Sequence, residues 1–373
     1  MSPAHARQRG LALIAAILIA AIIAGLAVAL SARDRQAILA VTRAREVASV
    51  DMLVQGLEVQ AARLLAADAA SGTHDSEDEA WRTTAYASAA EGFIASARLE
   101  DAQRRFNLNS LVIAPPAGDP AAPTGAEPAA TPEAVAPAVA ESPAARQAML
   151  ELARVHGVTS PLARPARDGS EEASGLRDDQ LAAVRFALLL EALDLPPAIL
   201  PAVLDWLDED GAARFPDGAE DDYYSRLTPA YRTANRRFSD VSELRLVRGV
   251  GEAVYARLEP FVTVLDVATP LNVNTAAPEL LMSLAPGIDR AIAEQLVAAR
   301  RAQPFTSLDA LLRHPALAGR ALLPTGLATG SRWFELTARV VRDELPYFRR
   351  SLLFRMEPSR ILTLHRAQPY TDG

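Results

Sequence analysis

The chain has 373 residues, more than one compact unit usually holds, and this length indicates two or three domains. Its formal net charge of −8 argues against a general nucleic-acid binder, because neutralising phosphates requires a basic surface. The chain contains no cysteine, which excludes disulfides and thiolate metal sites.

An uncharged apolar run occupies residues 11–30 and follows Arg7 and Arg9. Its length suits a helix that spans the hydrocarbon core of a bilayer, and the two arginines orient its start toward the cytoplasm. A cleaved secretory signal is the alternative, because the small residues at 27–29 (AVA) could serve an ordinary signal peptidase.

The segment after the apolar run favours the anchor over the cleaved signal. Residues 33–67 contain no proline and no turn cluster. Their apolar side chains recur at helical spacing. This stripe consists of Val50, Leu53, Val54, Leu57, Ala61, Leu64 and Leu65. We therefore predict one continuous helix from residue 11 to residue 65.

Strand-forming pieces lie at both ends of the remaining chain, and a helical region lies between them. Short strands are predicted at Phe93–Leu99 and Asn107–Ile113. The proline- and alanine-rich residues 114–145 cannot build a core and read as a linker. From Gln147 to about His314 the pattern is mostly helical. Residues 333–370 return to β-rich alternation with a turn near 343–346, so the sequence predicts an α+β domain interrupted by a helical one.

An enzymatic function has little support in the sequence. The five histidines are scattered, without metal-ligand spacing or a neighbouring nucleophile motif. Gly249 and Gly251 begin a dinucleotide-binding pattern whose last glycine is missing. We therefore expect a chain that is not an enzyme.

Two segments of the helical region, 242–262 and 278–312, read as a helix, a glycine-containing hairpin and a second helix. They resemble helix-hairpin-helix modules, which hold nucleic-acid backbones through hairpin amides. In the second segment basic and acidic residues balance, and Asp289 stands where the motif usually keeps a glycine. We favour a protein-packing role, and DNA binding remains the alternative.

The densest polar cluster of the sequence lies between residues 204 and 238. Eight acidic residues crowd this stretch, which also carries Gly211 and Gly218. So many like charges repel one another unless solvent or a cation separates them, and hard oxygen ligands suit Ca²⁺. The candidate ligands are Asp208, Asp210, Glu220, Asp221 and Asp222. The spacing does not match an EF-hand, and a solvated acidic loop is the alternative.

Taken together, these pieces resemble one family, the type II secretion system protein K, whose members are minor pseudopilins. The resemblance covers nearly the whole chain. Its motifs are RGLALIAAILIAA, LEDAQRRFNLNSL, LDWLDED, GAEDDYYSRLTPAYRTANRRF, SELRLVRGV and LNVNTAAPELLMSL.

The resemblance implies a pilin-like fold: a long N-terminal helix on a small antiparallel sheet, interrupted by a large, mostly helical insert with helix-hairpin-helix-like modules. The implied parts are a leader (1–10), a transmembrane segment (11–30), the helix and first strands (31–113), the linker (114–145), the insert (146–325) and the C-terminal strands (326–373).

The resemblance also implies how the chain is processed. Prepilin peptidase would cut after Gly10, and Leu11 would become the methylated N-terminus. The fifth mature residue is Ala15 rather than the glutamate of most pilin-like subunits. A subunit with no neighbour above it does not need that buried carboxylate, and this suits a position at the tip.

The implied function is a subunit that forms the tip of the periplasmic pseudopilus and helps to initiate its assembly. The chain would be held in the inner membrane by one helix, with its bulk in the periplasm. Implied partners are minor pseudopilins of types I and J and other pseudopilins, with exported substrates or the outer-membrane secretin as further contacts, and no nucleic acid. The resemblance also adds weight to calcium in the acidic loop.

Overall fold

The computed structural model describes residues 3–90, 92–112, 142–158, 177–266, 268–320, 322–357 and 359–367. Within α1 the side chains of residues 3–17, 19–23 and 27 lie outside this description. Gly10 and Leu11, the predicted processing residues, and Ala15, which takes the place of the usual glutamate, are among the residues whose side chains lie outside this description. No helix among the described residues combines the length and hydropathy that crossing a membrane requires.

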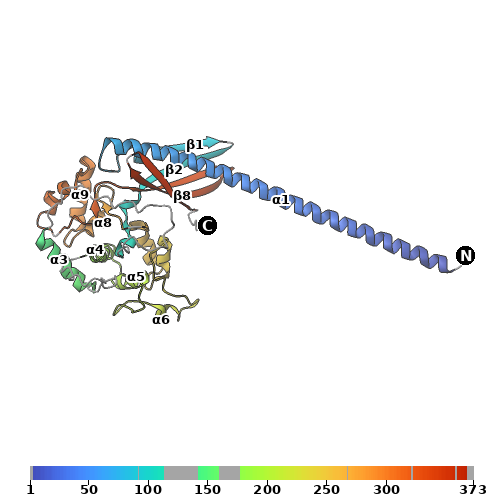
Figure 1. Cartoon of the computed structure of the whole chain (residues 1–373), viewed down its shortest axis with the longest axis horizontal. Coiled ribbons are helices and arrows are strands. Elements are labelled where there is room, and N and C mark those ends of the chain that lie inside the picture. Colours follow the sequence, from blue (N-terminus) through green and yellow to red (C-terminus); the bar gives the residue numbers. More distant parts are fainter. Residues whose placement is uncertain are drawn as a thin grey trace, which may run out of the picture.

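One long helix, α1 (Pro3–Ser71), dominates the shape of the molecule. Figure 1 shows its N-terminal half projecting away from the body while its C-terminal part lies against the sheet. The predicted continuous helix is therefore confirmed from residue 33 to its expected end at residue 65, and α1 continues to Ser71. The predicted stripe is the face that packs, because Val50, Leu57 and Leu65 are buried against strands.

The sheet under α1 has five antiparallel strands in the order β1-β2-β7-β8-β9. Their bounds are β1 (Tyr86–Ala90), β2 (Phe93–Asp101), β7 (Trp333–Arg342), β8 (Leu345–Glu357) and β9 (Arg360–Ala367). Asp343 and Glu344 adopt positive φ angles and form the predicted turn between β7 and β8. This combination of helices and an antiparallel sheet is the predicted fold class.

One predicted strand is wrong. Residues 107–113 were expected to be extended, but only Phe106–Asn107 form a strand (β3), and Leu108–Leu111 turn into the 3-10 helix η2. The Asn107 side chain accepts a hydrogen bond from the backbone N–H of Asn109 (3.1 Å) and so starts this turn. Such local side-chain bonding competes with strand pairing. Strand β1 was not predicted.

The middle of the chain forms a second, mostly helical body. Its α-helices are α3 (Pro143–Val155), α4 (Asp178–Ala192), α5 (Ile199–Leu207), α6 (Asp221–Tyr224), α7 (Glu252–Leu258), α8 (Pro278–Met282), α9 (Arg290–Ala302) and α10 (Leu308–Leu312). Helix α3 begins at Pro143, inside the predicted linker, whose residues 114–141 lie outside the described ranges.

Smaller elements complete the described chain. They are α2 (Ala80–Thr83), η1 (Ala102–Arg104), η3 (Val241–Leu246), η4 (Glu259–Phe261), β4 (Val262–Thr263), β5 (Leu271–Asn272), η5 (Pro315–Leu317) and β6 (Leu327–Ala328). Strand β4 pairs with β3, and β5 pairs with β6, so these short ladders tie distant parts of the chain together.

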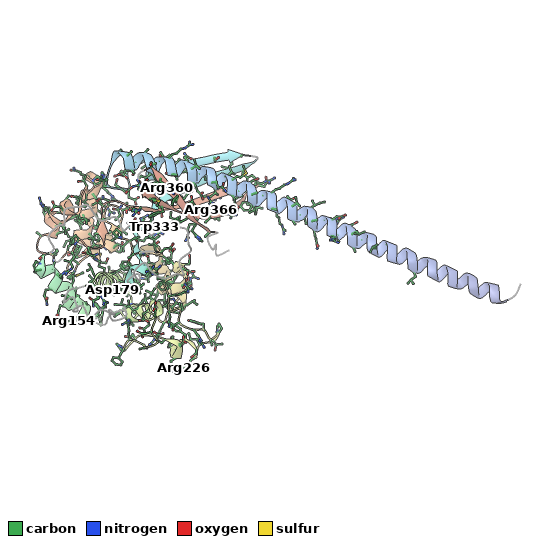
Figure 2. All side chains as sticks on the ribbon, viewed as in Figure 1. Arg154, Asp179, Arg226, Trp333, Arg360 and Arg366 are labelled. Atoms are coloured by element: carbon green, nitrogen blue, oxygen red, sulfur yellow. The ribbon has the colours of Figure 1, made fainter. Side chains whose placement is uncertain are left out.

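The two bodies meet through a small apolar contact and a polar one. Trp333, which Figure 2 places between the sheet and the helical body, packs against Ala102 and Leu265. Its ring also lies 4.6 Å from that of Phe354, measured between centroids. The polar contact involves Asp75 and Asp101, whose carboxylates both accept hydrogen bonds from Ser331 (2.7 Å each).

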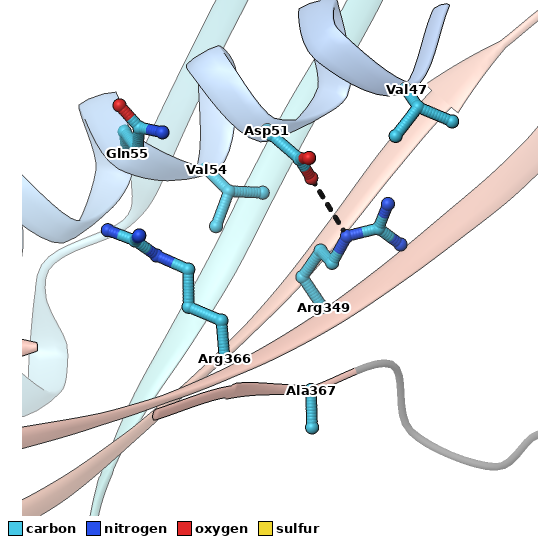
Figure 3. Close-up of a pocket in the computed structure, with 7 residues that line it drawn as sticks. All are labelled: Val47, Asp51, Val54, Gln55, Arg349, Arg366 and Ala367. Carbon is cyan, nitrogen blue, oxygen red and sulfur yellow. Dashed lines mark hydrogen bonds and ion pairs between the residues drawn. The ribbon is translucent and has the colours of Figure 1, made fainter. Parts of the chain in front are cut away.

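On the other side of the sheet, a groove of about 280 Å³ lies between α1 and the edge strand β9. Figure 3 shows Arg349 and Arg366 reaching from the strands toward the helix. Arg349 donates from Nε to Asp51 Oδ1 (3.0 Å), so an ion pair links strand β8 to α1 at the groove.

Candidate metal centre

Helix α5 carries two carboxylates, those of Asp205 and Asp208, on one face. Every residue of α5 after Pro201 is buried, because its apolar side chains pack in the helical body. Asp205 and Asp208 lie three residues apart, which places them on the same face of the helix. Asp208 is the C-terminal cap of α5, and its N–H donates to the carbonyl of Leu204 (3.0 Å).

The chain then folds back and brings a third and a fourth carboxylate to the first two. Oxygen atoms of Asp208, Asp210 and Glu220 all lie within 4.8 Å of one another. Glu220 comes directly before α6 and is 4% exposed, as is Asp208, whereas Asp210 is at the surface. The cluster is therefore buried on one side and open on the other.

Arg214 lies inside this cluster as its only ion-paired cation among the described residues. Its Nη2 donates to Asp208 Oδ2 (2.7 Å), and its Nε lies 3.2 Å from Asp205 Oδ1 without hydrogen-bond alignment. The backbone N–H of Arg214 donates to Asp205 Oδ2 (3.1 Å). Asp205 is fully buried. Asp205 was not among the ligands predicted from the sequence.

Several buried oxygen atoms of the cluster have no partner among the described residues. They are Oδ1 of Asp208 and both carboxylate oxygens of Glu220. Leaving a buried charged group unpaired is costly, so such atoms point to a missing ligand. Hard carboxylate oxygens are the donors that Ca²⁺ prefers.

Burial changes the acidity of these groups. Burial raises the pKa of Asp208 to about 6, although Arg214 acts in the opposite direction. Burial, with the charges of Asp205, Asp208 and Asp210, raises the pKa of Glu220 to about 7. The nearby Thr233 hydroxyl acts to lower it but forms no hydrogen bond of normal geometry. A bound divalent cation would favour the ionised form of both groups.

The structure places the other two predicted ligands elsewhere. Asp221 is exposed and accepts a hydrogen bond from the backbone N–H of Thr233 (3.0 Å). Its carboxylate also lies 3.8 Å from Arg232. Asp222 is exposed on α6 and is not part of the cluster. Three of the five predicted ligands therefore converge.

Aromatic packing and one arginine hold the loop against the helical body. The rings of Trp206, Tyr224 and Tyr231 pack against one another, and the Tyr224 centroid lies 5.3 Å from that of Trp206 and 5.2 Å from that of Tyr231. Arg248 donates from Nη1 to the carbonyl of Gly218 (2.9 Å). A Cβ atom at Gly218 would overlap the Asp205 carboxylate and the Arg214 backbone, so only glycine fits there.

A second carboxylate cluster contains its own cation. Asp68, Asp75 and Glu79 bring their oxygens within 4.8 Å of one another at the end of α1. Arg355 from β8 lies 3.1 Å from Asp68 and 3.0 Å from Asp75. Unlike the first cluster, none of these three carboxylates has a buried oxygen without a hydrogen-bond partner among the described residues, so the cluster serves as a junction and not as a candidate metal centre.

The hairpin between α8 and α9 uses its polar groups internally. Gly287 adopts a positive φ of 78°, and Asp289 accepts a hydrogen bond from the N–H of Ile292 (2.9 Å). Arg290 pairs with Glu279 (2.7 Å). The carboxylate therefore occupies the helix N-terminus at which a phosphate would bind.

Comparison with known proteins identifies the family. Two family models, both described as "Type II secretion system (T2SS), protein K", match residues 104–267 and 271–330. Together they cover more than half of the chain. The chain belongs to the type II secretion system protein K family. The first match contains the acidic cluster, and the second contains the hairpin of α8 and α9.

Protein K relatives from several bacteria resemble the chain. The Pseudomonas aeruginosa protein is 40% identical over 160 residues, which is 42% of this chain and 47% of that protein. The Klebsiella pneumoniae protein is 39% identical over 192 residues, covering 47% and 59% respectively. The chain spans about half the length of these relatives. The DNA-binding alternative has no support from these comparisons.

One solved structure shares the fold of this protein K family member. It is a crystal structure of the GspK-GspI-GspJ complex from enterotoxigenic Escherichia coli. The match covers 88% of this chain and 100% of that one, with a TM-score of 0.62 and 22% identity.

Proposed function

We propose that the chain is a minor pseudopilin that forms the tip of the type II secretion pseudopilus and helps to initiate its assembly for the export of folded proteins. One observation carries this beyond family membership: α1 packs on a five-stranded sheet with one half and projects with the other. The role is structural, without catalysis.

Residues 11–30 would anchor the chain in the inner membrane, with the bulk in the periplasm. Prepilin peptidase would cut after Gly10 and leave Leu11 as the N-terminus. The unbroken backbone of α1 supports this anchor, because it continues through residues 27–31, where a signal peptidase would otherwise cut. A secretory signal is normally followed by a cleavable, non-helical segment.

The mature N-terminus tests this proposal. Mass spectrometry of the protein from a host with an active type II system should find Leu11 first, carrying one methyl group. Gly10→Val should remain uncut, whereas Gly25→Val, in the same apolar helix with open space around it, should be processed normally. A terminus near Ser31 would contradict the pseudopilin function.

The partners would be minor pseudopilins of types I and J and other pseudopilins. The neighbouring solved structure is a complex of such subunits, and the projecting part of α1 exposes large apolar side chains. Ile38 is 65% exposed, Leu39 56% and Val41 53%, and such a contiguous run of exposed apolar side chains is typical of a surface that a neighbouring subunit covers. Exported substrates or the outer-membrane secretin would be further contacts.

We also propose that residues 31–113 and 326–373 form the pilin-like part, that residues 146–325 form the helical insert, and that the insert contains two helix-hairpin-helix-like modules. The modules would serve as packing units of the helical body. Leu280, Leu284 and Leu296 of the second segment are all buried in its core, which supports this role.

Calcium would bind at the carboxylates of Asp208, Asp210 and Glu220, next to Asp205. The support is the convergence of these oxygens and the unpartnered atoms of Asp208 and Glu220. When bound, Ca²⁺ would supply the positive charge that keeps these carboxylates together, and it would act as a structural ion.

A further inference from the structure

Arg214 pairs with carboxylate oxygens that a metal ion at the cluster would need as ligands. Its side chain is 17% exposed, and its guanidinium pairs with both Asp205 and Asp208. Ca²⁺ takes six to eight oxygen ligands, and a guanidinium has only hydrogen-bond donors to offer. Asp208 Oδ2 therefore cannot be fully available to the ion while Arg214 Nη2 is 2.7 Å away.

The charges of the site explain why an arginine lies there. The guanidinium of Arg214 pairs with two carboxylates, those of Asp205 and Asp208, and Asp210 and Glu220 add two further negative charges nearby. The guanidinium stays charged at every physiological pH. It thus offsets part of the repulsion between the carboxylates when no metal ion is bound, yet it leaves the oxygens of Glu220 without a partner.

The backbone of Arg214 is held independently of its side chain. Its N–H donates to Asp205 Oδ2 (3.1 Å), and its carbonyl accepts from the N–H of Gly218 (2.6 Å). The guanidinium can therefore leave the cluster by side-chain rotation while the loop stays in place. The Arg214 side chain is itself 17% exposed, so one side of it already faces solvent.

We infer that Arg214 is an internal counter-ion that holds the ion-free site together and that a divalent cation must displace, so that this residue sets the calcium affinity of the protein. This inference rests on the proposed calcium site. It predicts two opposite effects of removing the guanidinium: a less stable ion-free protein and tighter calcium binding.

The test compares full-length protein with Arg214→Gln in calcium titrations by calorimetry and in thermal melts with chelator. The variant should bind Ca²⁺ about tenfold more tightly or better, because the ion no longer breaks a charge-assisted hydrogen bond. Its melting midpoint in chelator should be lower than that of the parent. Arg232→Gln removes an 86% exposed guanidinium beside Asp221 and should change neither quantity.

The possible outcomes separate the two proposals. If no protein binds Ca²⁺, both the site and the counter-ion role are overturned. If the parent binds and Arg214→Gln binds equally or more weakly, only the counter-ion role is overturned. Should Arg214→Gln fail to fold without the ion, Arg214→Lys keeps the charge but cannot span both carboxylates, and it should bind Ca²⁺ more tightly than the parent.

Discussion

Asn272 donates from Nδ2 to Asp101 Oδ2 over 2.9 Å and so joins the helical body to the end of strand β2. The same carboxylate oxygen accepts hydrogen bonds from the hydroxyls of Thr275 (2.6 Å) and Ser331 (2.7 Å). The Asn272 amide also donates to the backbone carbonyl of Asp75 (3.1 Å). These groups are buried, and each has a partner, so the junction has one defined geometry.

The first prediction concerns this junction. Asn272→Ala should lower the free energy of unfolding by about 1–3 kcal/mol, because it removes a donor from the buried Asp101. Equilibrium denaturant unfolding provides the measurement. Gln303→Ala, at an exposed position after α9, should leave stability unchanged. Equal stability of the two variants would mean that the hydrogen bonds at the junction contribute nothing.

The second prediction concerns pH and the cluster of Asp68, Asp75 and Glu79. Burial, followed by the charges of Glu79 and Asp75, raises the pKa of Asp68 to about 7 from its usual 3.8, although Arg355 acts to lower it. Between these values the folded protein holds a proton that the unfolded chain has lost. This contribution to stability is therefore present at low pH and is lost as the pH rises toward 7.

In Asp68→Asn the side chain is uncharged at every pH, so the variant should not lose this contribution to stability as the pH rises. Relative to the parent, the variant should become progressively more stable as the pH is raised from 5 to 7, and the difference should level off above pH 7. Denaturant unfolding at several pH values measures this difference in stability between variant and parent. Asp78→Asn, at an exposed position in the same segment, should change the unfolding free energy by the same amount at every pH. A constant difference for Asp68→Asn would show that Asp68 does not titrate in this range.

The third prediction concerns the attachment of β9 to α1. Glu58 is 4% exposed and accepts hydrogen bonds from Arg366 Nε (2.8 Å), Arg366 Nη2 (2.5 Å) and Ser351 Oγ (2.6 Å). Glu58→Ala should cost about 1–3 kcal/mol of unfolding free energy and speed amide exchange in β9. Gln55→Ala, on the exposed face of the same helix, is the control. Unchanged exchange in β9 would contradict this role.

The elements with strong periodicity were predictable from the sequence, and the short irregular ones were not. The stripe of α1 and the long strands β2, β7, β8 and β9 repeat their pattern often enough to be recognised. Strand β1 consists largely of alanine, and its pairing depends on β2 beside it. The turn at Asn107 depends partly on Leu265, whose N–H donates to the Asn107 side chain from far along the chain.

The sequence predicted that the acidic loop holds the candidate site, but it did not predict which of its residues converge. Charge density pointed to the loop, but spacing alone cannot say which of three consecutive acidic residues faces inward. Glu220 precedes the first turn of α6 and points into the cluster, whereas Asp221 and Asp222 begin the helix and face solvent. Arg214 could not be identified at all, because its role depends on how the loop folds back onto α5.

The fourth prediction uses two glycines of this loop. Gly218→Ala should disturb the site, since the new Cβ would overlap the Asp205 carboxylate and the Arg214 backbone. Gly211→Ala, seven positions earlier in the same loop, has no atom within 4 Å of its new Cβ and should be tolerated. Melting temperatures and calcium titrations of both variants provide the comparison. Equal behaviour would show that the loop accommodates a side chain at residue 218.

The last prediction concerns calcium itself. An ion that binds only the folded protein must raise its stability, by about 2.7 kcal/mol when the free ion is at a hundred times its dissociation constant. The melting midpoint should therefore rise from excess chelator to millimolar Ca²⁺. Asp208→Asn and Glu220→Gln should lose this rise, because they remove converging oxygens. Asp222→Asn should keep it, because Asp222 lies outside the cluster. If Ca²⁺ leaves the melting midpoint of the parent unchanged, these carboxylates do not form the site. The same conclusion follows if Asp222→Asn alone abolishes the rise.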